Sequence, residues 1–298
     1  MLLLNKSIIL IIISIQCFSL TTTETPLFPP SLSAREVSLS KASSGDHYFN
    51  NMLRNPASIA NTKGISIQTN EYLDIDYSSI IFVNDYKEYN FGIHYIGSSI
   101  NDINRSIVSG TTVVELDTYV PYEYHALSGA VAKRINDISF GIGLRYKTLI
   151  LDNTVNQSIE GFTGLGVKLF KQFKLSTSIQ NLTLENASPN ALQYEYPIYT
   201  TAINYYVTPG TTFFLAFVHN ENEVSTHLTV HYSLEHYINH FIPFRVGLDH
   251  NRYTFGVGLI LDPFEIDIGW AQSRSTEIDD QVTIGFSYLF EQQHRLYK

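Results

Sequence analysis

The sequence predicts an all-β fold, a transmembrane β-barrel of about fourteen antiparallel strands with a short N-terminal hatch segment. Segments that alternate apolar and polar residues recur from residue 64 to residue 290, and this alternation is typical of strands with one apolar face. Several segments reach the roughly 9–11 residues that a tilted strand needs to cross a bilayer. A secretion signal precedes them. These features together predict a barrel in the outer membrane of a Gram-negative-type bacterium.

The composition agrees with this fold class. Hydrophobic residues make up 44% of the chain and the mean hydropathy is -0.02, as expected when lipid-facing and lumen-facing residues alternate along each strand. Tyrosine (20 residues) and phenylalanine (18 residues) are abundant, and both favour strands and the aromatic girdles of membrane barrels. The net charge of -9 argues against a nucleic-acid partner. The single cysteine excludes a disulfide framework.

Residues 1–19 have the pattern of a signal peptide. Lys6 precedes an apolar core at residues 8–15, and cleavage after Ser19 would fit the small-residue rule. The alternative is a lipoprotein acylated on Cys17, which is weaker because Gln16 is a poor residue before a lipidated cysteine. No other run reaches the 18 or so apolar residues of a helical span. An inner-membrane helical protein is therefore not expected.

Residues 20–63 are expected to form a lead-in and a hatch. The lead-in, residues 21–32, is rich in Thr and Pro, whereas residues 33–60 show no strand alternation and contain a short helical turn near residues 47–53. Proline restricts its predecessor to extended geometry, so Asn55-Pro56 marks a break. We expect this segment to fold against or inside the barrel, with Asn55, Pro56 and Ala57 as hatch or gating residues.

The strand pattern defines a barrel over residues 64–290, followed by a C-terminal tail at 291–298. It is clearest at residues 138–147, where Ile, Phe, Ile, Leu and Tyr occupy one parity and Ser, Gly, Gly, Arg and Lys the other. The candidate strands are 65–70, 77–84, 89–97, 111–117, 124–133, 139–151, 161–170, 173–182, 199–207, 211–219, 226–235, 245–251, 253–261, 264–271 and 282–290. Because bacterial single-chain barrels have an even number of strands, we expect about fourteen strands and one early segment assigned in error.

The connections are expected to alternate in length. Tight turns at 171–172, 208–210 and 262–263 would be periplasmic, and longer pieces at 98–110, 181–196 and 273–281 would face outward. A soluble periplasmic sandwich is the alternative, but its strands would be shorter. The polar parity also carries recurrent glycines, which fit a barrel lumen better than a sandwich surface: Gly141, Gly143, Gly164, Gly166, Gly256, Gly258, Gly269 and Gly285.

Five charged residues share the lumen parity: Arg145, Lys147, Lys168, Glu265 and Asp267. Charges that share a lumen either pair across it or tune a channel. The simpler interpretation, which we favour, is a filled structural interior.

Neither a metal site nor an enzyme is expected. Histidines cluster late in the chain, at His219, His227, His231, His236, His240 and His250. His227 and His231 lie two alternations apart, about 13 Å at the normal strand rise, which is too far to share one metal ion. His125, Ser128 and Asp137 are near one another in sequence, but no G-x-S-x-G elbow accompanies them. No cofactor is expected either.

Several short motifs resemble the FadL-like superfamily of outer-membrane barrels, and within it the PorV/PorQ family. Asn55-Pro56-Ala57 followed by Ile59-Ala60 matches the N-P-A-x-hydrophobic-A pattern that precedes the first strand in that group. Residues 129–133 and 138–147 are similar to its G-x-G-x-K/R-Y hairpin, and residues 178–182 look like its Q-N-L ending. The chain departs from the family at residues 176–177, where the family has Gly, and in extending past Phe290. The resemblance covers most of residues 45–290.

This resemblance implies a fourteen-stranded barrel with an N-terminal hatch. FadL proper imports long-chain hydrophobic compounds through a lateral opening, whereas PorV-type members serve type IX secretion and hand folded cargo to surface-attachment machinery. At 298 residues the chain is short for FadL proper, which favours protein export or surface assembly with secretion-machinery or cargo proteins as partners in outer-membrane lipid. The alternative is a FadL-like passive channel for long-chain fatty acids or other hydrophobic small molecules. A purely structural barrel is a third possibility.

Overall fold

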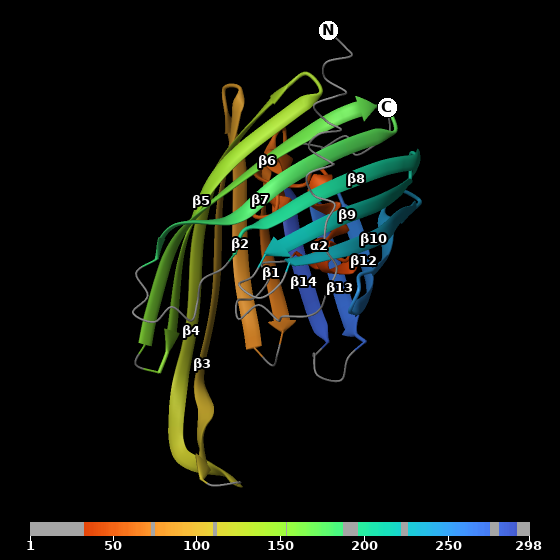
Figure 1. Ribbon diagram of the computed structural model, residues 1–298. Coiled ribbons are helices and arrows are strands. Elements are labelled where there is room, and N and C mark those ends of the chain that lie inside the picture. Colours follow the sequence, from red (N-terminus) through yellow and green to blue (C-terminus); the bar gives the residue numbers. More distant parts are fainter. Residues whose placement is uncertain are drawn as a thin grey trace.

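The structure is a computed structural model that describes residues 33–72, 75–109, 112–152, 154–186, 196–221, 226–274 and 280–290. These residues form a closed barrel of fourteen antiparallel strands (Figure 1). Each strand pairs with its sequence neighbours, and β14 closes the barrel onto β1. The predicted fold class and strand number are confirmed. The predicted signal peptide, residues 1–19, and the predicted tail, residues 291–298, lie outside the described residues.

The strand boundaries are β1 Gly64–Tyr72, β2 Ile75–Tyr86, β3 Tyr89–Ser109, β4 Thr112–Ile135, β5 Ile138–Leu151, β6 Thr154–Phe170, β7 Phe173–Asn186, β8 Ile198–Thr208, β9 Thr211–Glu221, β10 Thr226–Ile238, β11 Ile242–Leu248, β12 Arg252–Leu261, β13 Phe264–Ser273 and β14 Gln281–Leu289. Among the described residues, no helix is long and apolar enough to cross a membrane.

Two sequence expectations near β3 and β4 were wrong. Residues 112–117 of one expected strand and 124–133 of the next belong to the single strand β4, and residues 98–109 continue β3 instead of forming an outward loop. The β3–β4 register shifts between Ile100 and Ile103 and again between Asn104 and Ser106. Bulges of this kind add unpaired residues and so break the two-residue alternation. This is why the strand pattern was not visible there.

The outer half of the β3–β4 hairpin stands apart from the other strands. Pairing of β2 with β3 ends at Ser78 and Gly97, and pairing of β4 with β5 ends at Tyr122 and Leu151. Beyond these positions β3 and β4 pair with each other as a two-stranded ribbon, which extends well past the rest of the barrel (Figure 1).

The two ends of the barrel differ in their connections. The connections at 87–88, 171–172 and 262–263 all lie at one end, and the first residue of β1 pairs with the last of β14 at that same end. We call this the tight-turn end. We call the opposite end, where β7 and β13 end and where β8 and β14 begin, the long-connection end. Residues 187–195 and 275–279, which fall within the expected outward loops, lie outside the described part of the chain.

The apolar parity of the strands faces outward. On β5 the side chains of Ile142 and Leu144 are 66% and 55% exposed, whereas Ser139 on the other parity is buried. Buried and exposed residues also alternate strictly along β14, where the large apolar side chains from Val282 to Tyr288 are the exposed ones. An outer surface of this kind would be unstable in water and suits contact with lipid.

Residues 33–62 lie inside the barrel, in the red and orange part of the chain in Figure 1. We call this segment the hatch. It comprises the short helix α2 (Ala34–Ser38) and three 3-10 helices, η1 (Ala42–Gly45), η2 (Phe49–Asn51) and η3 (Pro56–Ile59). α2 contacts β11 to β14, η1 contacts β7 to β10, and η3 contacts β3 to β6. The hatch therefore reaches most of the barrel wall.

Candidate functional site

The hatch is held in shape by local capping. The Ser33 hydroxyl accepts from the backbone of Glu36 at 3.2 Å, and the Glu36 carboxylate accepts from the backbone of Ser33 at 3.0 Å. This capping box satisfies amide groups at the start of α2 that have no partner within the helix. Asn55 has the same role for η3, because its Oδ1 accepts from the Ala57 amide at 3.0 Å while Pro56 occupies the first turn.

Two glycines on the barrel wall form the seat of Asn55-Pro56-Ala57. A Cβ added to Gly141 on β5 would lie 2.5 Å from the carbonyl carbon of Pro56 and 2.6 Å from the Ala57 nitrogen. A Cβ on Gly164 of β6 would overlap Oδ1 of Asn55. Since real Cβ atoms do not approach other atoms so closely, this part of the hatch requires glycine at both positions.

The helix α2 is seated in the same way on the other side of the barrel. A Cβ on Gly269 of β13 would overlap the carbonyl oxygen of Ala34, and a Cβ on Gly256 of β12 would overlap the side chain of Ser38. Glycines that face the lumen thus make room for α2 on one side of the barrel and for η3 on the other.

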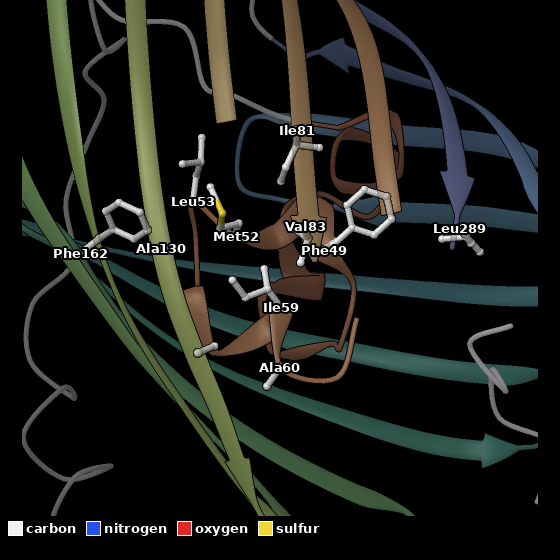
Figure 2. Packing of buried hydrophobic residues seen from close by; sticks show 11 residues of the cluster. Phe49, Met52, Leu53, Ile59, Ala60, Ile81, Val83, Ala130, Phe162 and Leu289 are labelled. Carbon is white, nitrogen blue, oxygen red and sulfur yellow. The ribbon is translucent and has the colours of Figure 1, made fainter. Parts of the chain in front are cut away.

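An apolar cluster joins the hatch to the wall (Figure 2). Hatch residues Phe49, Met52 and Ile59 are fully buried and pack with wall residues that include Val83 and Phe162. Full burial of a large apolar side chain contributes about 1.5–3 kcal/mol. The hatch and the barrel wall therefore share a hydrophobic core, which holds the hatch in place.

A first charge network fixes α2 to the wall. The Arg35 guanidinium donates to the Glu235 carboxylate of β10 at 2.7 and 3.0 Å and to Asp46 of the hatch at 2.7 Å. Arg245 of β11 pairs with Asp267 of β13, and its Nε lies 3.7 Å from Glu235. All these groups except Asp46 are almost completely buried. Buried charges of this kind are stable only when they are paired.

Two tyrosines extend this network. Tyr237 donates to Glu235 at 2.6 Å, and Tyr48 of the hatch donates to Glu265 of β13 at 3.4 Å. Glu265 also lies 3.8 Å from Arg245. The predicted lumen residues Glu265 and Asp267 therefore belong to the interface between hatch and wall.

A second charge group lies on the opposite wall. Lys147 of β5 pairs with Glu160 of β6, and Arg145 lies 4.0 Å from the same carboxylate. The hatch adds Arg54, which pairs with Glu36 at 3.1 Å and lies close enough to Arg145 for their charges to interact. Two of the predicted charges thus gather here.

Burial shifts the ionisation of several hatch groups. It raises the pKa of Glu36, an effect that Arg54 partly offsets. It lowers the pKa of Lys41 to about 8, and the nearby positive charge of Arg54 acts in the same direction. Burial also lowers the pKa of His47 to about 3, with the positive charge of Lys174 as the second cause. His47 is therefore neutral at ordinary pH.

Comparison with solved structures shows that the fold is a known one. The toluene transporter TodX of Pseudomonas putida has a TM-score of 0.61 at 11% identity, covering 89% of this chain and 99% of TodX. A Pseudomonas aeruginosa FadL homologue scores 0.60 at 9% identity, covering 90% and 100%. The monoaromatic hydrocarbon channel CymD scores 0.59 at 10% identity, covering 86% and 98%. The chain shares the fold of the FadL-type channels. No family model matches the sequence, and no curated protein matches it.

The FadL-like part of the sequence resemblance thus agrees with the fold, while none of the structural neighbours named above is of the PorV/PorQ kind. TodX is described as a toluene transporter and CymD as a monoaromatic hydrocarbon channel. Within the described part of the chain, no group of three His, Cys, Asp or Glu side chains is placed to hold a metal ion.

The five predicted lumen charges do not form one cluster. Arg145 and Lys147 lie on the wall near Glu160, whereas Glu265 and Asp267 lie near Arg245 in the first network. Lys168 is exposed at the tight-turn end of β6 and joins neither group.

Sequence reasoning missed the hatch and wall partners Arg35, Glu36, Glu235 and Arg245. A signal existed for the two wall residues, because Glu235 and Arg245 are charged residues on the inward parity of spanning strands. His231 follows the same rule, and its Nδ1 lies 2.7 Å from the Ser40 carbonyl of the hatch. The hatch residues had no such signal, because the segment lacks a regular period.

Proposed function

We propose that this protein is an outer-membrane conduit for small hydrophobic molecules and that the hatch gates its lumen. The observation that carries the proposal is the hatch itself, which is seated inside a barrel of the FadL fold by glycine contacts and by the ion pair of Arg35 with Glu235 of the wall. The fold neighbours TodX and CymD support it, since the first is described as a toluene transporter and the second as a monoaromatic hydrocarbon channel.

The inner wall carries a buried apolar cluster on the path toward the hatch. Tyr77, Tyr124 and Leu149 belong to a buried cluster on the lumen parity of β2 to β5. The hydroxyls of Tyr77 and Tyr122 are 3.2 Å apart, and the rings of Tyr77 and Tyr124 meet edge to face at 6.4 Å. We propose that apolar solutes contact this aromatic cluster before they meet the hatch.

The strand ladder suggests where a solute could leave sideways. The β6–β7 register shifts three times, and Asn181 of β7 has a positive φ of 57°. Pairing between β7 and β8 ends at Gln180 and Ile198, although β7 continues to Asn186. We propose this region as the lateral route, because interrupted pairing is the weakest part of a closed barrel wall.

In this proposal Asn55, Pro56 and Ala57 are gating residues. Their seat on Gly141 and Gly164 would be vacated when η3 moves away from β5 and β6. Glu265 and Asp267 would hold the α2 side in place through Arg245 and Tyr48, and Arg145 and Lys147 would stabilise the wall facing η3. Lys168 would act outside the gate, at the tight-turn end.

The test is uptake by whole cells. A strain lacking the gene should take up radiolabelled toluene, or radiolabelled oleate as a second probe, more slowly than the parent, and the intact gene should restore the rate. The protein should fractionate with the outer membrane and migrate differently on gels before and after boiling. Equal uptake of both probes with and without the protein would overturn the proposal.

Protein export is the second candidate function, and the projecting β3–β4 ribbon favours it. The ribbon extends beyond its neighbours at the end where partner proteins of the cell surface would approach, and its two edges carry backbone groups that can pair with another strand. Proteomics of medium, cell surface and periplasm in the same deletion strain would test this function. Export requires a set of proteins to disappear outside and accumulate within.

A further inference from the structure

Three nitrogen-bearing side chains from different elements meet at the tight-turn end of the lumen. Lys174 comes from β7, Arg134 from the end of β4, and His47 from the hatch between η1 and η2. Arg134 is in register with Ser139 of β5, Ser139 is in register with Gly166 of β6, and the Lys174 stem lies over Gly166. The hatch is close by, because a Cβ on Gly45 would lie 3.3 Å from Cβ of Ser176, two residues from Lys174 on β7. The positive charges of Lys174 and Arg134 also act on the His47 ring. Like charges are thus brought together where the hatch meets the wall.

These groups have few partners within the protein. Lys174 is only 5% exposed, yet its ammonium makes no hydrogen bond or ion pair with a described residue. Its stem crosses Gly166, with Cε 3.6 Å from where a Cβ would lie. Nδ1 of His47 is buried without a partner. Gly166 therefore makes room for a lysine whose ammonium has no hydrogen bond or ion pair with a described residue.

The nearby carboxylate is already engaged. Asp46 is the acidic group that acts on both Lys174 and His47. Its Oδ2 accepts from Arg35 at 2.7 Å, and its Oδ1 accepts from the His47 backbone amide at 2.9 Å. These two bonds use about half of its acceptor sites, and no hydrogen bond joins it to Lys174 among the described residues.

We propose that Lys174, Arg134 and His47 form a binding site for a phosphate-type oxyanion. Two cationic side chains would supply the charge-assisted hydrogen bonds that phosphate prefers. The anion could be free in solution or part of a lipid headgroup, since both present the same oxygens. This site does not depend on what the barrel transports.

Binding would strengthen the closed state. His47 belongs to the hatch, whereas Lys174 and Arg134 belong to the wall, so one anion would bridge the two. A ligand that binds this arrangement better than an opened one shifts the population toward it. Phosphate is therefore expected to slow proteolysis of the hatch.

The test uses the full protein in neutral detergent micelles, in a buffer free of phosphate. Inorganic phosphate is titrated by calorimetry against the wild type, Lys174→Met, Arg134→Gln and the control Lys168→Gln. Losing one charged hydrogen bond should weaken binding about tenfold or more. Lys168 is an exposed neighbour in the same hairpin, so its variant should bind within about twofold of the wild type. A second arm titrates phosphatidylglycerol micelles.

The outcomes separate the sources of the anion. Phosphate binding that Lys174→Met and Arg134→Gln weaken supports a soluble ligand, and binding of phosphatidylglycerol alone with the same losses supports a headgroup. Because Lys174→Met could disturb folding, a heat-modifiable gel band is required of each variant, and Arg134→Gln changes a partly exposed residue. Absence of binding in both arms, or equal binding by all four proteins, would overturn the proposal.

Discussion

At the scale of single residues, close packing between hatch and wall leads to a first prediction. Gly141→Ala should destabilise the protein by about 1–3 kcal/mol, the usual cost of overpacking, because the new Cβ would strike Pro56. The control is Gly129→Ala on the adjacent strand, where a Cβ meets nothing within 4 Å. Urea unfolding in lipid vesicles measures both variants. If the two variants were equally stable, close packing of Pro56 against Gly141 would be contradicted.

The buried carboxylate Glu235 allows a second prediction. Glu235→Gln leaves Arg35 and Arg245 without their shared partner, and breaking a buried ion pair typically costs about 3–5 kcal/mol. The hatch should then become sensitive to protease while the barrel keeps its heat-modifiable migration. Glu88→Gln is the matched control, since Glu88 forms an exposed pair with Lys133. A hatch as resistant in Glu235→Gln as in Glu88→Gln would show that this network does not anchor it.

The lysine Lys41 gives a third prediction, on pH. Its pKa is about 8 in the folded protein and 10.5 as an ordinary lysine, so the unfolded chain binds the proton more tightly. The cost of charging Lys41 is fully present below pH 8 and is relieved between pH 8 and 10.5, where stability should rise by about 1–3 kcal/mol. Lys41→Met should remove this rise from the unfolding free energy measured against pH. If the unfolding free energies of the wild type and Lys41→Met changed in parallel with pH, the lowered pKa of Lys41 would be refuted.

At the scale of elements, alternation in the sequence predicted most strands because each has one face to lipid and one to the lumen. β5 and β14 show this well. The pattern failed at residues 98–117, where bulges interrupt the period of two. A bulge depends on how two strands pair across the sheet, so single-strand periodicity does not reveal it.

The hatch was harder to predict than the strands. The break at Asn55-Pro56 was visible, because proline restricts the residue before it to extended geometry. The docking of Arg35 on Glu235 was not, since it joins residues 200 positions apart. The lumen charges were found by parity, but parity says which face a residue occupies and not which partner it meets. Arg145 and Asp267 therefore appeared as one set, although they lie in different groups.

At the scale of the whole molecule, the two sides of the hatch are held differently. The α2 side is fixed by buried charge pairs with β10, and its neighbours β11 and β13 belong to the same network. The η3 side is held by glycine contacts and apolar packing on β3 to β6. Opening is therefore expected to begin at η3, where no ion pair between η3 and the wall is seen among the described residues. Hydrogen exchange should be faster in η3 than in α2, and the opposite order would contradict this expectation.

The most direct test of the central claim is a reversible cross-link between hatch and wall. A Cβ on Gly164 of β6 would lie 2.8 Å from Cγ of Asn55 at the start of η3, so cysteines at these two positions would bring their side chains into contact. The one cysteine of the sequence, Cys17, falls in the predicted signal peptide. In cells carrying Asn55→Cys with Gly164→Cys, oxidation should block uptake of radiolabelled toluene and reduction should restore it. Neither single variant should respond. Uptake that continues unchanged when gels show the cross-link complete would contradict a gate formed by the hatch.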